Sequence, residues 1–103
     1  MTGEGMAKLL AECPEMKRLR DELTKRGIEW HDDSESFDGI HTFIRTKWLH
    51  KGFEVSVLWG YSKAFGGKHG ISYGYPNMLE CWYQCCKQDP EPMTVDEIVE
   101  EYA

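Results

Sequence analysis

Two runs of alternating polar and apolar residues, four residues apart, constrain the fold of this chain more than any other feature. In residues 40–48, isoleucine, threonine and tryptophan occupy every second position, and residues 53–59 repeat the pattern with phenylalanine, valine and tryptophan. Such alternation is typical of a strand with one buried face, and the β-branched content favours a strand. Because the turn sequence His50-Lys51-Gly52 joins the two runs, the sequence predicts a β-hairpin.

Both ends of the chain carry a helical pattern. Residues 6–26 have apolar side chains at helical spacing, and Pro14 divides them into two predicted helices because proline is tolerated in a first helical turn. Near the other end, Thr94 and Glu97 have the spacing of a capping box, followed by an apolar stripe. This spacing predicts a closing helix.

Two further strands complete a predicted sheet. Residues 28–31 predict a first strand and residues 78–86 a fourth, whereas 32–39 are predicted to form a polar turn and 88–92 a linker. The predicted fold class is α+β, an antiparallel meander sheet of about four strands with N-terminal helices and a C-terminal helix packed on one face. A chain of this length is expected to form a single domain, residues 1–103.

The face of the sheet without helices is expected to carry Phe43 and Trp82. Both residues alternate with the apolar positions of their strands, so they point away from the predicted core. An antiparallel sheet tolerates water on one face, but large aromatic rings on that face often indicate a partner.

Residues 55–79 contain no carboxylate, although the whole chain has a formal net charge of -6. This acid-free window is rich in glycine, lysine and aromatic residues. Glycine lets backbone N–H groups close on a phosphate, lysine supplies positive charge, and aromatic rings stack on bases. The window therefore predicts a site for an anionic, nucleotide-like ligand. Its candidate ligand-binding residues are Trp59, Tyr61, Lys63, Phe65, Lys68, His69, Ser72 and Tyr73.

An alternative for the acid-free window is a long hairpin loop whose aromatic residues pack locally. Its glycine spacing matches neither a P-loop nor a dinucleotide-binding fingerprint. The acidic charge of the whole chain disfavours binding to duplex nucleic acid, because such binding neutralises phosphates with lysine and arginine.

The other polar residues predict no catalytic or metal site, and no cofactor. The spacing of Cys13, Cys81, Cys85 and Cys86 matches no standard zinc site, so we expect reduced structural thiols. Zinc binding through Cys81, Cys85 and a histidine is the less favoured alternative. The four histidines are dispersed and no serine lies in a nucleophile elbow, which predicts a protein that is not an enzyme.

The chain is expected in the cytoplasm. No stretch approaches the roughly 20 apolar residues that a membrane-spanning helix needs, so we expect no membrane contact. The first residues show no basic start followed by an apolar run, which excludes a typical secretory signal.

The segments LRDELTKRGIEW, GYSKAFGGKHG, LECW and DPEPMTVDEIVEEY give the chain a layout that resembles small accessory proteins of bacteriophages and prophages. Some proteins of that kind sequester nucleotide second messengers, often between subunits, and the anti-CRISPR class blocks a nuclease by direct binding. The resemblance implies an anti-defence protein in the host cytoplasm. The leading hypothesis is a sponge for a nucleotide-like immune signal, expected as a homodimer because one chain is small to enclose a nucleotide. The alternative is a protein–protein inhibitor or adaptor of a host defence protein, acting through its acidic surface or open sheet face.

Overall fold

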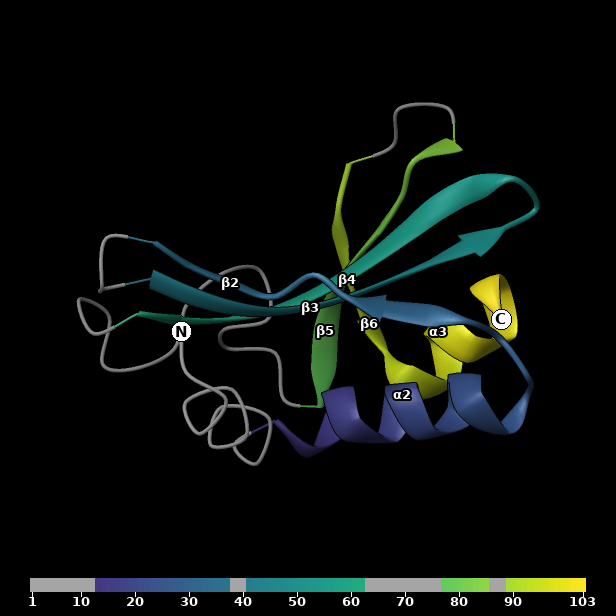
Figure 1. The fold of residues 1–103 in the computed structure, drawn as a ribbon, viewed down its shortest axis with the longest axis horizontal. Helices are drawn as coiled ribbons and strands as arrows, with labels where there is room; N and C mark the ends of the chain where they lie inside the picture. Colours follow the sequence, from purple (N-terminus) through teal and green to yellow (C-terminus); the bar gives the residue numbers. More distant parts are fainter. Residues whose placement is uncertain (1–12, 38–40, 63–76, 86–88) are drawn as a thin grey trace.

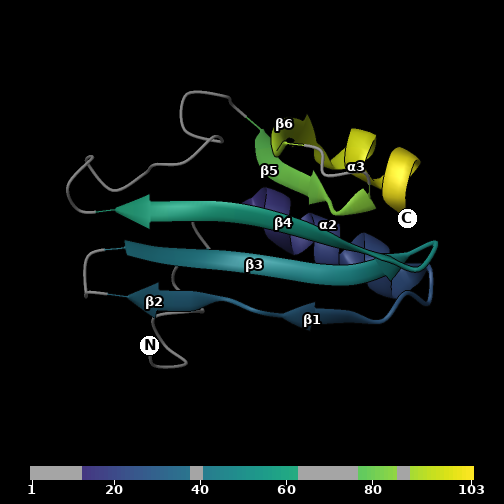
Figure 2. The ribbon, with the colours of Figure 1, turned by 90° about the horizontal axis from the view of Figure 1, so that it is seen from above.

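The computed structural model describes residues 13–37, 41–62, 77–85 and 89–103. Its elements are α2 (Pro14–Lys25), β1 (Trp30–Asp32), β2 (Glu35–Phe37), β3 (His41–His50), β4 (Phe53–Ser62), β5 (Met78–Tyr83), β6 (Glu91–Thr94) and α3 (Val95–Tyr102). The strands form one sheet, and Figures 1 and 2 show both helices on the same side of it. The predicted α+β class is therefore confirmed. The predicted helix before Pro14 lies outside the described residues.

All strand pairs are antiparallel, and the order across the sheet is β1-β3-β4-β5-β6, with β2 pairing with a second part of β3. The predicted meander is thus present, but the predicted count of about four strands is wrong because β2 and β6 were missed. They lie in the segments predicted as a turn, 32–39, and as a linker, 88–92. Both are short strands at the edges of the described sheet, where charged residues and a proline such as Pro92 are tolerated.

The predicted hairpin joins β3 to β4. His50 pairs with Phe53, so the loop between the strands consists of Lys51 and Gly52. Their φ angles are 54° and 83°, and positive φ at both central residues is the mark of a type I′ turn, whose twist matches that of the flanking strands. Both strands continue beyond the predicted ends, because they pair with each other over ten residues each.

The two described helices begin and end as their sequences predict. Pro14 starts α2, and Gly27, with φ at 72°, follows its end. At α3, the Thr94 hydroxyl accepts a hydrogen bond from the backbone N–H of Glu97 at 3.2 Å, and the Glu97 carboxylate accepts one from the Thr94 N–H at 2.9 Å. The predicted capping box is therefore confirmed. The bond from the Thr94 backbone is the main cause of the lowered pKa of Glu97.

The core lies between the sheet and the two helices. Its largest fully buried side chain is Trp48 on β3, whose indole Nε1 donates a hydrogen bond of 2.7 Å to the carbonyl oxygen of Tyr102 on α3. Trp59 on β4 belongs to the same core. The other buried apolar residues are Cys13, Met16, Leu19, Leu23, Ile44, Val55, Val57, Leu79, Cys81, Met93, Val95 and Ile98.

Candidate functional site on the open face of the sheet

Within the described residues, the helices cover only one face of the sheet. Figure 2 views the sheet from the other, open face, with α2 behind β3 and β4. Antiparallel register aligns the open-face residues of neighbouring strands. Arg45 on β3 is paired with Leu58 on β4, and Leu58 is paired with Glu80 on β5. These three residues form a first row across the sheet, with a cation at one end and a carboxylate at the other.

A second row lies next to the first. Lys47 on β3 is paired with Ser56 on β4, and Ser56 is paired with Trp82 on β5. Trp82 is 38% exposed, so part of a large aromatic residue is in contact with solvent. The second row therefore also has a cation on β3, but it has an aromatic ring on β5.

The two rows line a shallow groove of about 200 Å³. Pockets that enclose small-molecule ligands usually measure roughly 300–1,000 Å³, so this groove suits a side chain of a partner better than a whole ligand. Its lining residues are Arg45, Lys47, Ser56, Leu58, Glu80, Trp82, Gln84 and Pro90.

Ion pairs hold the cations of β3 in place. The Lys47 Nζ lies 2.9 Å from an oxygen of Asp33 and 3.5 Å from an oxygen of Glu54, and Arg45 lies 3.3 Å from Asp33. The hydrogen bond from Lys47 is the main reason that the pKa of Asp33 is lowered, and the same bond raises the pKa of Lys47. Because these groups are partly exposed, the main effect of the ion pairs is to fix the positions of the two positive charges on the open face.

The structure places few of the predicted ligand-binding residues. Trp59 lies in the core with 8% of its side chain exposed, so its described role is packing rather than stacking on a ligand. The backbone of Tyr61 pairs with Thr42 in the sheet, but its side chain is not described. The remaining candidates lie outside the described residues: Lys63, Phe65, Lys68, His69, Ser72 and Tyr73. The nucleotide site therefore stays a prediction.

The sequence predicted the position of some open-face residues but not how they are grouped. The expectation that Trp82 faces the open side is confirmed, and Phe43, half-buried, shares the alternation of Arg45 on β3. The sequence did not indicate that Arg45, Lys47 and Glu80 line one groove together with Trp82. Strand alternation does assign Arg45 and Lys47 to the face of Phe43 and Glu80 to the face of Trp82, but only the register shows which of them align.

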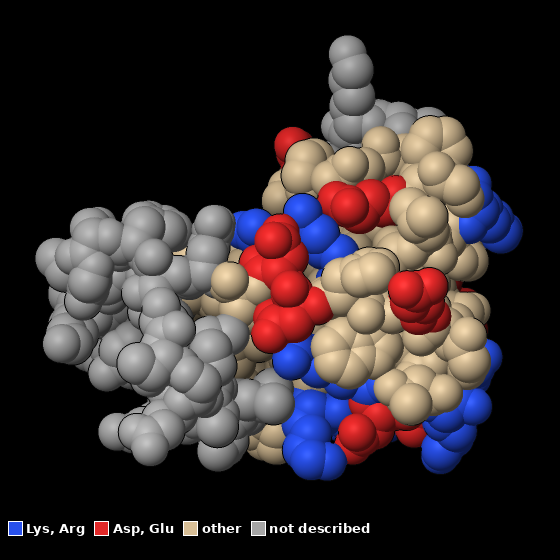
Figure 3. Space-filling view, viewed as in Figure 1, with Lys and Arg blue, Asp and Glu red and all other residues tan. Residues whose placement is uncertain are grey.

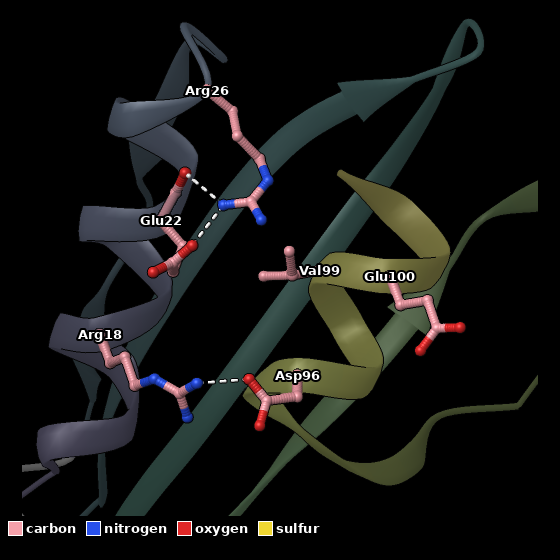
Figure 4. A pocket seen from close by; sticks show the side chains of 6 residues that line it. All are labelled: Arg18, Glu22, Arg26, Asp96, Val99 and Glu100. Carbon is pink, nitrogen blue, oxygen red and sulfur yellow. Dashed lines mark hydrogen bonds and ion pairs between the residues drawn. The ribbon is translucent and has the colours of Figure 1, made fainter.

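A second groove separates α2 from α3 (Figure 4) and measures about 340 Å³. Arg18, Glu22 and Arg26 follow one another along the face of α2 that borders this groove. Arg18 pairs with Asp96 of α3, and Arg26 pairs with Glu22 on its own helix, which lowers the pKa of Glu22. The first pair joins the two helices and the second stabilises the end of α2, so we assign the groove a structural role.

A third hollow, of about 450 Å³, lies beside β6 and α3 and is bordered by four carboxylates. Their residues are Glu91, Glu97, Glu100 and Glu101. In the part of the chain that the structure describes, no three potential ligand side chains are grouped so that they could hold a metal ion. Figure 3 shows acidic and basic side chains interspersed over one side of the molecule rather than gathered in patches of one sign.

The Cys81 thiol lies in the core. Burial is the main cause that raises its pKa to about 12, with the nearby carboxylates of Glu91 and Glu101 adding to the effect. Since a thiolate, not a thiol, binds metal and attacks electrophiles, this environment favours a structural role for Cys81.

None of the helices in ranges 13–37, 41–62, 77–85 and 89–103 has the length and apolar character needed to span a membrane. Comparisons with known proteins match the chain to no family model, no curated protein and no solved structure.

Proposed function

We propose that the protein is a non-enzymatic binding protein that contacts a protein partner with the open face of its sheet, as an inhibitor or adaptor. The exposed Trp82, aligned across β4 with the fixed cations of β3, is the observation that carries the proposal. The resemblance to bacteriophage accessory proteins supports a host defence protein as the target. This function is the alternative that the sequence left open, and the open face that supports it lies in the described part of the chain.

The chemistry of the open face suits protein recognition. Tryptophan and arginine are the residue types most enriched among side chains that dominate binding energies, and they act best when surrounding contacts exclude water. Trp82 lies at the end of the second row, next to the row that contains Arg45. Because Asp33 holds Arg45 and Lys47 in position, the face presents its charges in a fixed pattern, which favours specificity for a complementary partner.

Replacing Trp82 by alanine is expected to weaken partner binding by at least about tenfold, because truncating a central aromatic anchor commonly costs about 2 kcal/mol or more. The tagged chain is used to recover partners from cells, and the purified partner is then titrated against each variant. Lys17→Ala is the matched control, since Lys17 lies exposed on α2, away from the open face. Equal binding by the Trp82→Ala and Lys17→Ala variants would contradict the proposal.

Capture of a nucleotide-like ligand is the second candidate function. It is favoured by the acid-free window, residues 55–79, whose ends are fixed in the sheet. β4 ends at Ser62 and β5 begins at Met78, and these two strands also carry part of each open-face row.

Isothermal titration calorimetry with cyclic and ADP-ribose-derived nucleotides tests this second candidate. We expect micromolar or tighter binding by the unmodified chain, and loss of the heat signal in the double variant Lys63→Glu/Lys68→Glu. The control, Lys17→Glu/Lys25→Glu, changes the net charge equally on exposed positions of α2. Absence of binding by the unmodified chain at micromolar concentrations, or equal loss in both double variants, would count against a nucleotide site.

A further inference from the structure

We infer that the open face binds a second copy of the same chain, so that two sheets pack face to face in a twofold-symmetric sandwich. This inference rests on the proposed function, because it names an occupant for the same surface. A target protein that used this face would have to compete with the second copy. Self-association would then set how much of the face is available to a target.

The first row is complementary to itself. A twofold axis that runs along β4 places β3 of each copy over β5 of the other. Because Arg45, Leu58 and Glu80 are in direct register, Arg45 of each copy then lies over Glu80 of the other. The two Leu58 side chains meet on the axis. One row therefore forms two identical opposite-charge contacts around an apolar centre.

The second row is complementary about the same axis. Lys47 of each copy lies over the Trp82 ring of the other copy, an arrangement that a cation–π interaction stabilises. The small Ser56 side chains meet on the axis, where they leave room for the longer residues on either side. Both rows are therefore complementary to themselves about the same symmetry axis.

An axis in the plane of the face but perpendicular to the strands does not fit. An axis perpendicular to the strands places β3 of one copy over β3 of the other. Arg45 and Lys47 would then face the cations of the second copy, and like charges across an interface are unfavourable. Of these two axes, the distribution of charge therefore favours the one along β4.

The sandwich is compatible with ordinary packing of two sheets. Antiparallel sheets pack face to face about 10 Å apart, with strand directions within roughly 30° of each other. Glu54 lies on β4, close to the axis, but its carboxylate contacts Lys47 and accepts a hydrogen bond from Gln84 of its own copy at 3.1 Å. These contacts reduce the repulsion between the two Glu54 side chains.

Charge reversal with mixing tests the sandwich. Sedimentation velocity of the unmodified chain is measured from about 1 to about 100 μM, which covers micromolar affinities, and should show a concentration-dependent dimer. Arg45→Glu and Glu80→Arg should each weaken the dimer by about tenfold or more, because each brings like charges together in the first row. An equimolar mixture of the two variants should dimerise again, because each mixed contact joins opposite charges. Ion pairs within one copy cannot produce this rescue.

Trp82→Ala provides a variant without a charge change. Thermal unfolding of each variant checks that it folds. A monomeric unmodified chain over the whole range would overturn the inference, as would a dimer that persists in both charge variants or a mixture that stays monomeric. If the chain is monomeric but Trp82→Ala still loses the cellular partner, the inference fails and the proposed function stands. If Trp82→Ala affects neither the dimer nor partner recovery, both fail.

Discussion

Replacing Trp48 by alanine is expected to lower the free energy of unfolding by about 3–5 kcal/mol, the usual cost of removing a large aromatic side chain from a core. Trp48 is only 1% exposed and is the largest fully buried side chain among the described residues. Its removal would leave a cavity between β3 and α3, and it would also remove the hydrogen bond to the carbonyl oxygen of Tyr102. Urea unfolding followed by circular dichroism measures the loss.

Trp48→Phe separates the two contributions. The phenylalanine keeps an aromatic ring in the core but lacks the N–H that the Tyr102 carbonyl oxygen accepts, so we expect a smaller loss than for Trp48→Ala. The free energy of unfolding of a small domain is about 5–15 kcal/mol. We therefore expect the alanine variant to be far less stable, with a free energy of unfolding that can still be measured under mild conditions. A loss below about 1 kcal/mol in Trp48→Ala would contradict the described core.

The elements that sequence analysis predicted well are those specified by local signals. The β3–β4 hairpin follows from alternation over two runs and from Lys51 and Gly52, which adopt positive φ in the turn between them. The start of α3 follows from Thr94 and Glu97, which form their two reciprocal hydrogen bonds within four residues. In both cases the deciding interactions lie close together in the sequence.

The missed strands depend on distant partners. In β2, Ser36 pairs with Thr42 of β3, and in β6, Pro92 pairs with Glu80 of β5. Both segments are short, polar or proline-containing, which is typical of turns and linkers when only local propensity is considered. Their strand geometry is imposed by the neighbouring strand, because its backbone groups need partners that the sequence of the segment does not reveal.

The candidate site likewise has a part that local sequence signals predict and a part that depends on distant partners. Alternation alone placed Trp82 on the open side, because it needs only the faces of one strand. The alignment of Leu58 with Glu80 needs the register of β4 against β5, which are joined by residues 63–77. No turn signal fixes that register. The self-complementary rows could therefore not be predicted from the sequence. Trp59 is different. Its alternation with Val55 and Val57 is a signal for the core, but the sequence analysis assigned it to the ligand site.

Leu19→Ala is expected to lower the free energy of unfolding by about 2–5 kcal/mol, because it removes a fully buried side chain where α2 packs on the sheet. Leu49→Ala is the matched control. It removes the same atoms from a side chain that is 71% exposed on β3, so we expect a change within about 0.5 kcal/mol.

Both leucine variants are measured by urea unfolding at low protein concentration, so that self-association through the open face does not add to stability. A large difference between them would show that only the helix-covered face contributes core packing energy, and that leucine on the other face is available for contacts with a partner. Equal losses in the two variants would contradict the assignment of the two faces. The face opposite α2 would then be a second core layer, and the open-face site would have to be abandoned.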